Sequence, residues 1–192
     1  MKVIVGLGNF GNRFKKTRHN LGFLVLDEFA KENRFPKFKM EKEFLAKVSE
    51  KKIGKEKIIL VKPETFINNS GLAVKRILEK LRTSNIEPLT SNLWVVHDDL
   101  DIPFGKIKIS FGKSSGGHKG VESIINEIGT KDFFRFRVGI KPEKKPKNVG
   151  EFVLQEFTKK EREKLKEIIE KTIHKIKIAI EEGIEKARSK NE

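Results

Sequence analysis

Cysteine is absent from this 192-residue sequence, and its absence excludes disulfides, thiol nucleophiles and cysteine-based zinc sites. Long apolar runs are also missing, because no stretch reaches the ~18 residues that a membrane-spanning helix needs. The chain starts directly with the short apolar run Lys2-Val3-Ile4-Val5 and lacks the long apolar region of a signal peptide. We therefore expect a cytoplasmic protein without a membrane partner.

Length and charge narrow the class of protein further. The chain suits one domain with a sizeable core. Its formal net charge of +15 and pI of about 9.9 favour a polyanionic partner such as nucleic acid, the alternative being a lysine-rich solvated surface. Eleven Lys or Arg but only four Asp or Glu fall within residues 106–147. Positive charge is therefore concentrated in one part of the chain.

The stretch Gly6–Asn20, GLGNFGNRFKKTRHN, lies between a predicted buried strand and the start of a predicted helix. Open α/β sheets bind ligands at the carboxyl ends of their strands, so this stretch is a candidate site. Its first six residues also match G-x-G-x-x-G, a dinucleotide fingerprint that requires a helix to begin inside the motif. Because the residues after Gly11 have no helical apolar face, a dinucleotide site is kept only as an alternative.

His19 comes directly before a helix that is predicted to run from Asn20 to Lys31, with Asn20 as its N-cap. The positive end of the helix dipole disfavours an imidazolium at this place, and a general base must be a neutral imidazole. The alternative is that His19 only caps the helix or packs against it.

Two further segments place polar side chains after predicted strands. TFINNSG precedes a helix with apolar residues at 74, 77, 78 and 81, and its asparagines suit either helix capping or recognition of a peptide backbone. The buried strand Leu93–Val96 leads into His97-Asp98-Asp99. These residues suggest either a metal site, although their spacing matches no standard ligand set, or a carboxylate that orients a catalytic histidine.

The basic segment combines alternating strands with a glycine-rich loop. Residues 106–111 and 134–140 alternate between apolar and polar side chains, which predicts two half-buried strands with basic residues on their other face. GKSSGGHKG lies between them and precedes a helix that ends at Gly129. Such a loop suits gating of a cleft or contact with a phosphate, the alternative being a plain connection. Two further strands are predicted at Glu43–Val48 and Ile58–Val61.

Four segments, in this order along the chain, resemble the motifs of the bacterial-type peptidyl-tRNA hydrolases. GLGN followed by TRHN resembles the opening of that family, TFINNSG its TFMN-x-SG segment, HDDLDIPFGK its HD-x-LD-x-P-x-G segment, and GGHKG its GGHNG loop. The resemblance runs from Lys2 to about Phe157. Ile67 stands where the family usually has Met, and Lys119 stands where it usually has Asn.

This resemblance implies an α/β fold, with a single domain built on a mixed twisted β-sheet flanked by helices. It implies hydrolysis of the ester that joins a peptide to the 3′ end of tRNA, with peptidyl-tRNA as the partner and with neither a metal nor an organic cofactor. A monomer is expected. The alternative is a non-catalytic RNA-binding relative, which predicts loss of His19 or Asp98, and both residues are present.

The residue chemistry suits this reaction, because water activated by His19 is the economical choice in a chain without cysteine. We expect Asp98 to orient His19, Asn9 to donate to the carbonyl or oxyanion, and Asn68 to hold the peptide backbone. The other candidates are Phe14, Phe66, Ile67, Gly117, His118 and Lys119 for substrate binding, and Lys108, Lys113, Lys119 and Arg137 for tRNA phosphates.

An apolar stripe near the C-terminus predicts a helix at about residues 159–188, within one domain that spans residues 1–192. We interpret the stripe as a docking face for the core, the alternative being a site for a partner. His174 on this helix is not expected to take part in function.

Overall fold

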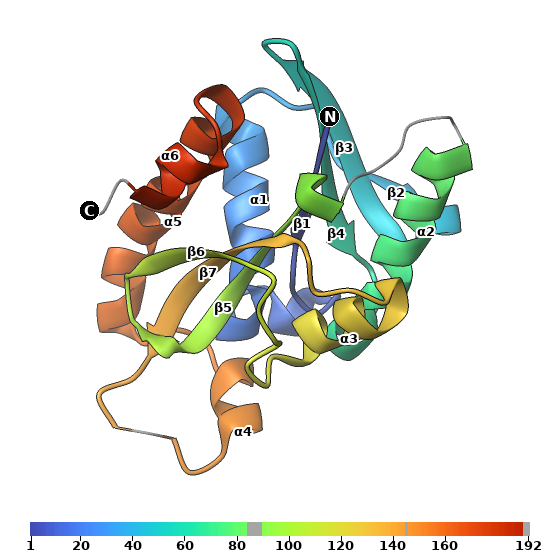
Figure 1. The fold of residues 1–192 in the computed structure, drawn as a ribbon. Helices are drawn as coiled ribbons and strands as arrows, with labels where there is room; N and C mark the ends of the chain where they lie inside the picture. Colours follow the sequence, from blue (N-terminus) through green and yellow to red (C-terminus); the bar gives the residue numbers. More distant parts are fainter. Residues whose placement is uncertain (84–89, 145, 190–192) are drawn as a thin grey trace.

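The apolar run after Met1 becomes the centre of the sheet, because both of its faces are covered by helices. On strand β1, Val3 and Val5 point to one layer of core residues and Ile4 points to the other. The sheet has seven strands in the order β2-β3-β4-β1-β5-β7-β6 (Figure 1). β4, β1, β5 and β7 are parallel neighbours, while β2, β3 and β6 pair in antiparallel fashion. The strands are β1 (Lys2–Gly6), β2 (Lys39–Glu41), β3 (Ala46–Ile53), β4 (Glu56–Pro63), β5 (Leu93–Pro103), β6 (Ile107–Phe111) and β7 (Phe134–Lys141).

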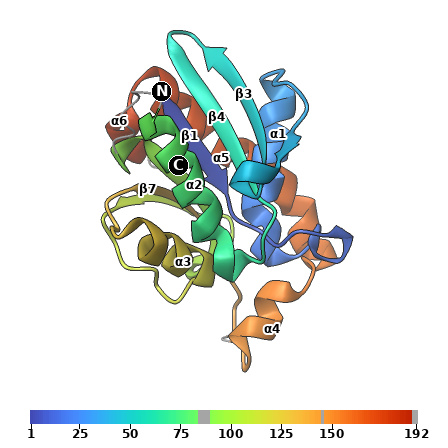
Figure 2. The ribbon, with the colours of Figure 1, turned by 90° about the vertical axis from the view of Figure 1, so that its right-hand side faces the viewer.

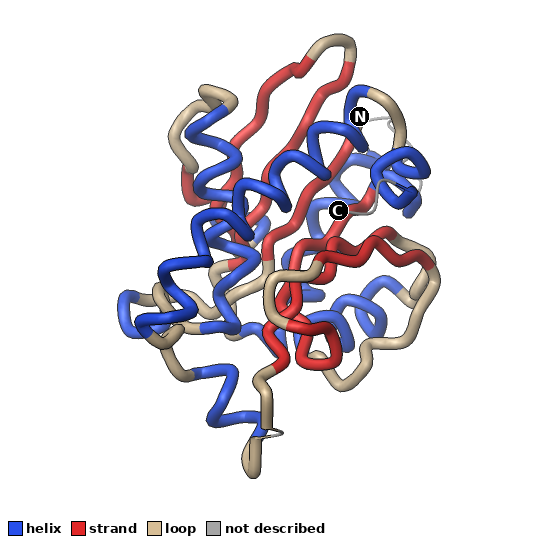
Figure 3. Tube along the Cα trace, turned by 90° about the vertical axis from the view of Figure 1, so that its left-hand side faces the viewer, coloured by secondary structure: helices blue, strands red, loops and turns tan. Residues whose placement is uncertain are grey.

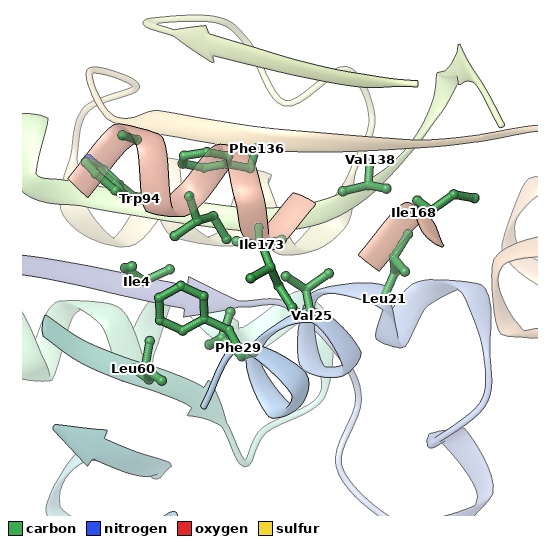
Figure 4. Packing of buried hydrophobic residues seen from close by; sticks show 14 of the residues in the cluster. Ile4, Leu21, Val25, Phe29, Leu60, Trp94, Phe136, Val138, Ile168 and Ile173 are labelled. Carbon is green, nitrogen blue, oxygen red and sulfur yellow. The ribbon is translucent and has the colours of Figure 1, made fainter. Parts of the chain in front are cut away.

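Helices cover the sheet on both sides. α2 and α3 lie over one face (Figure 2), and α1 lies with α5 and α6 over the other (Figures 1 and 3). Figure 4 shows the core on the α1–α5 side, where Phe29, Trp94 and Ile173 come from different elements and pack together. The helices are α1 (Leu21–Glu32), α2 (Ser70–Thr83), α3 (Lys119–Ile128), α4 (Val149–Leu154), α5 (Lys159–Glu181) and α6 (Ile184–Ser189).

The computed structural model describes residues 1–83, 90–144 and 146–189. Over these ranges it shows a single α/β domain with a mixed sheet flanked by helices, which confirms the predicted fold class. In the same ranges, no helix combines the length and the apolar character that crossing a membrane requires.

Several predicted boundaries were wrong. The C-terminal helix is not continuous from 159 to 188, because the chain leaves α5 at Glu181 and turns at Gly183, whose φ of 98° is unfavourable for other residues, before α6 begins. The strand predicted from Glu43 begins only at Ala46. Residues Lys42–Phe44 instead form a 3₁₀ turn (η3) that ends in a left-handed Leu45.

Strand β5 is much longer than the predicted Leu93–Val96, and this difference positions the site. It keeps its pairing with β7 through His97, Asp98 and Asp99, so these polar residues lie inside the strand and not after its end. The apolar pattern stops at Val96, but the backbone ladder continues because β7 offers a partner at each position.

Gly22 allows the first turn of α1 to lie against the ends of β1 and β5. A side-chain carbon at position 22 would come within 2.3 Å of the Leu7 nitrogen and 2.4 Å of the Val96 oxygen, which real side chains do not tolerate. This close approach brings the residues just before α1, including His19, to the part of β5 that carries Asp98.

Candidate active site

Two histidines from distant segments meet at one carboxylate. His19 lies in the 3₁₀ turn η2 (Arg18–Asn20) before α1, and its Nδ1 lies 3.0 Å from each carboxylate oxygen of Asp98. His118 lies at the start of α3, and its Nε2 lies 3.1 Å from Oδ1 of the same carboxylate. Asp98 is 2% exposed and His19 is 8% exposed. The predicted pairing of His19 with Asp98 is thus present, and His118 adds a second partner.

Hydrogen bonds indicate which ring nitrogen carries the proton in each histidine. Nδ1 of His118 accepts from the backbone N–H groups of Gly120 and Val121 and caps α3, so the proton resides on Nε2 and is donated to Asp98. His19 donates its Nδ1 proton to Asp98, which leaves a lone pair on its Nε2. His19 therefore has the tautomer that a general base requires.

Asp98 stays ionised in this environment. Burial by itself raises the pKa of a carboxyl group, but the charges and hydrogen bonds of His19 and His118 outweigh burial and hold the pKa of Asp98 far below its ordinary value. A buried carboxylate that accepts from both rings fixes their orientation, and it stabilises positive charge that develops on His19.

The same three side chains form the one group of potential metal ligands found within residues 1–83, 90–144 and 146–189, with ligand atoms within 4.8 Å of one another. Coordination through Nε2 of His118 would move its proton to Nδ1 and break the cap of α3. Because all three side chains already serve one another as hydrogen-bond partners, the arrangement suits acid–base chemistry better than metal binding.

Asn9 and Asn20 join the loop after β1 to the η2 turn. The side chain of Asn20 accepts from the Asn9 backbone nitrogen at 2.8 Å and donates to the Asn9 carbonyl at 2.9 Å. Asn20 occupies the N-cap position of α1, as expected, but its side chain makes this clamp and not a cap. Asn9 in turn accepts from the Ile67 backbone nitrogen through Oδ1 at 2.9 Å. Within the part of the chain that the structure describes, no hydrogen bond uses the Nδ2 group of Asn9, so this group is available as a donor.

The clamp also brings the predicted substrate-binding residues together. Ile67 is buried in the core between α2 and the sheet, whereas its neighbour Asn68 is exposed, and no hydrogen bond within the described ranges uses the Asn68 side chain. Helix capping therefore does not occupy Asn68. Phe66 is 46% exposed and lies 4.9 Å, ring centre to ring centre, from Phe10, a neighbour that sequence reasoning did not identify.

Phe14 and Gly117 lie on loops around this site. Phe14 ends the 3₁₀ turn η1 (Asn12–Phe14), and its ring carries the Arg13 guanidinium at 4.5 Å from the ring centre. Gly117 is exposed and adopts a φ of 79°, directly before His118. The glycine-rich loop thereby carries His118 to Asp98, a role that its sequence alone did not indicate.

The predicted phosphate-binding residues lie on β6, on β7 and in the segment from the end of β6 to the start of α3. Lys108, Lys113 and Lys119 are exposed, while Arg137 donates through Nε to Asp99 at 2.7 Å and is partly buried. Arg135 was expected with Arg137 on the polar face of a half-buried strand. It is only 2% exposed, however, and its Nη1 donates to the Ser114 carbonyl at 2.9 Å. Burial, followed by the nearby charge of Arg137, lowers the pKa of Arg135 to about 10. Arg135 thus holds the glycine-rich loop from beneath.

Arg18, directly before His19, was not identified from sequence. It is 3% exposed, and its Nη2 donates to Glu161 at the start of α5 at 2.7 Å. Because Arg18 adjoins His19, this contact ties the η2 turn to the C-terminal helices. Its Nη1 donates to three carbonyl oxygens, those of Phe152, Gln155 and Glu156.

His97 lies beneath this network and is completely buried. Its Nδ1 donates to the Asp98 carbonyl at 2.6 Å, and its ring centre lies 4.6 Å from that of His118. Burial, followed by the proximity of His118, lowers the pKa of His97 well below its ordinary value of 6.5. His97 is therefore neutral in the folded state at pH values at which the unfolded chain binds a proton.

This difference predicts acid sensitivity. Below pH 6.5 the unfolded state takes up a proton at His97 that the folded state refuses, so the free energy of unfolding falls as the pH drops below that value. Replacing His97 by Gln should reduce this slope by up to about 1.4 kcal/mol per pH unit. Urea unfolding between pH 7.5 and 5 measures the slope, and His174→Gln, at an exposed position of α5, is the control. Equal slopes for the wild type and the His97 variant would contradict this prediction.

The dinucleotide alternative requires a helix that begins inside the glycine motif, and the described residues of this loop contain no such helix. Gly11 is followed by the short turn η1, and α1 begins only at Leu21, ten residues after the last glycine of the fingerprint. No long helix therefore directs its N-terminus at the glycines of this loop.

Comparisons with known proteins agree with this geometry. A family model described as peptidyl-tRNA hydrolase matches residues 3–192. Peptidyl-tRNA hydrolase of Thermodesulfovibrio yellowstonii is 45% identical over 97% of this chain and 96% of its own length, and that of Aquifex aeolicus is 44% identical over 94% and 91%. A crystal structure of peptidyl-tRNA hydrolase from Acinetobacter baumannii matches with a TM-score of 0.87 at 27% identity, covering 98% of this chain and 92% of that one. With its motifs, its fold and its His19–Asp98 pair in agreement, this chain belongs to the peptidyl-tRNA hydrolase family.

Proposed function

We propose that this member of the family hydrolyses the ester of peptidyl-tRNA with His19 as the general base, Asp98 as its orienting carboxylate and Asn9 as the donor to the carbonyl. The activity itself, release of free tRNA for reuse in translation, follows from the family. The observation that carries the assignment of residues is the hydrogen bond between His19 Nδ1 and Asp98, because it leaves Nε2 free to take a proton. The same pair weighs against a non-catalytic RNA-binding relative.

The reaction then proceeds by attack of water on the ester carbonyl carbon. Nε2 of His19 takes the proton of the water as the new C–O bond forms, and the Asp98 carboxylate stabilises the imidazolium. The Nδ2 group of Asn9 donates to the oxyanion of the tetrahedral intermediate. As the bond to the ribose 3′ oxygen breaks, His19 returns the proton to that oxygen, which yields a peptide acid and a tRNA with a free hydroxyl.

The two parts of the substrate, peptide and tRNA, are assigned to different sides of Asp98 along the sheet. Asn68, Phe66, Phe14 and the segment of Ile67 follow strands on the β1–β4 side of Asp98, and we assign the peptide to this side. Lys108, Lys113 and Arg137 lie on or after strands on the β7–β6 side, and we assign tRNA phosphates to them. Lys119 offers only donors and a positive charge at the N-terminus of α3, so we assign it to a phosphate as well. We propose a cytoplasmic monomer that requires no metal or organic cofactor.

The assay that tests this function compares two substrates on the same tRNA. One carries an N-blocked peptide and the other carries the corresponding unblocked amino acid. The blocked substrate should be hydrolysed at least about tenfold faster, because only it presents a peptide carbonyl and amide that Asn68 can bind and no charged amino group next to the ester. Equal rates, or no release from either substrate, would refute the proposal.

A further inference from the structure

A cavity of about 330 Å³ lies between the free edge of the sheet and the C-terminal helices, apart from the His19–Asp98 site. β6 forms one wall, and α5 and α6 form the other; Figure 1 shows these helices beside that edge. Five of its nine described lining residues are basic, namely Lys106, Lys108, Lys171, Lys175 and Arg188. Among residues 1–83, 90–144 and 146–189, no acidic side chain belongs to the lining.

The positive charges of this cavity are only partly compensated. Lys171 pairs with Glu167 at 3.0 Å and Arg188 pairs with Glu185 at 2.9 Å, whereas no ion pair of Lys106 or Lys108 occurs within the described ranges. Lys175 is only 7% exposed, and its Nζ donates to the Ala187 carbonyl at 3.4 Å. Lys106 and Lys108, which form no ion pair within the described ranges, give this cavity a positive potential.

The cavity continues the basic side of the proposed active site. Lys108 lies opposite Arg137 in the pairing of β6 with β7, and Arg137 lies opposite His97, the neighbour of Asp98, in the pairing of β7 with β5. Two strand spacings, roughly 10 Å, therefore separate the catalytic strand from Lys108. Arg137, which is paired with Asp99, and Lys108 therefore lie between the catalytic strand and the cavity.

We propose that this cavity binds a backbone phosphate of the tRNA part of the substrate. This phosphate belongs to a nucleotide before the terminal one, because the cavity lies farther from the scissile ester than the terminal nucleotide reaches. The inference rests on the proposed function and adds a contact to it. Its ligand is a phosphate group, and the continuity with Lys108 and Arg137 favours a phosphodiester of the same tRNA over a free phosphate ion. Such a contact strengthens binding independently of tRNA sequence.

The test uses the double variant Lys106→Glu/Arg188→Glu with two substrates, intact peptidyl-tRNA and the same peptide on adenosine, which carries no phosphate. Both residues are exposed, and neither belongs to the proposed catalytic group. For intact peptidyl-tRNA we expect KM to rise about tenfold or more at low salt, and the slope of log KM against log salt to fall by about two units. Hydrolysis of the adenosine substrate should not change.

The matched control is Lys52→Glu/Lys55→Glu, which changes the net charge equally in the β3–β4 hairpin at the opposite side of the sheet. The proposal is overturned if the KM for intact peptidyl-tRNA in the cavity variant equals that in the control. It is also overturned if both substrates lose the same factor, because the change would then act through the active site. Should the charge reversals unfold the protein in thermal melts, Lys106→Gln/Arg188→Gln replaces them, with about half the change in salt slope expected.

Two further measurements separate the possible sources of error. Binding of inorganic phosphate alone to the wild type and to the cavity variant is measured by calorimetry; if only the wild type binds it, while the salt slope for intact peptidyl-tRNA is the same in both proteins, the cavity binds free phosphate and the proposal fails. Direct binding of uncharged tRNA to both variants gives Kd without hydrolysis. A wild type that binds tRNA through the cavity but releases no peptide would refute the proposed function and leave this inference standing.

Discussion

Replacing His19 by Ala is expected to slow hydrolysis of peptidyl-tRNA by about 10²–10⁴-fold, because the variant loses the group that takes the proton from water. Single-turnover hydrolysis at saturating enzyme measures the chemical step directly. Binding of tRNA, followed by fluorescence anisotropy, should stay within about twofold of wild type, since the residues assigned to phosphates lie on β6, β7 and the glycine-rich loop.

His174→Ala is the control for this variant, because it removes an exposed histidine of α5 and leaves the His19–Asp98 pair intact. A loss smaller than about tenfold at His19 would mean that another group activates the water. A loss of tRNA affinity equal to the loss of rate would instead make His19 a binding residue.

Replacing Asp98 by Asn is expected to lower kcat by about 10²-fold or more with a small change in KM. Asp98 accepts from Nδ1 of His19 and Nε2 of His118, so a carboxamide would direct its NH₂ group at one of two donors. To avoid this, His19 would adopt the other tautomer and present an N–H group to the water in place of a lone pair. The variant also loses the charge that stabilises the imidazolium.

Asp101→Asn is the matched control, because Asp101 is an exposed carboxylate on the same strand. A ¹⁵N–¹H spectrum adds an independent measurement, since the Nδ1 proton of His19 should lose its charged acceptor only in the Asp98 variant. Equal losses of kcat at positions 98 and 101 would show that Asp98 has no special role, and thermal melts would reveal a loss caused by unfolding.

Local patterns in the sequence determined the central elements of the fold. Alternating or continuous apolar residues marked β1, the start of β5 and β7, and apolar residues at helical spacing marked α1, α2 and α3. The catalytic candidates were also visible, because His19, Asp98 and Asn68 each lie in a segment that resembles a family motif. Such signals are short-range, since they depend on neighbours within one or two turns of chain.

Contacts between distant segments were decided by the tertiary structure alone. His118 lay in a loop that suggested gating or phosphate binding, yet it caps α3 and donates to Asp98, twenty residues away in sequence. The alternating pattern placed Arg135 on the polar face of its strand, but Arg135 is buried, and its side chain donates to the glycine-rich loop. Neither arrangement follows from local periodicity, because both arise only when β6, β7 and α3 pack around the end of β5.

The boundaries of the helices and strands also depend partly on local sequence and partly on tertiary contacts. The sequence by itself determined that residues 2–5 form a buried strand, that a helix follows His19, and that positive charge concentrates in residues 106–147. Only the tertiary structure decided that β5 continues through Asp98 and that the C-terminal helix breaks at Gly183. A strand extends as far as a neighbouring strand offers hydrogen-bond partners, and a helix stops where the packing of its apolar stripe ends, so both limits depend on residues far away in the chain.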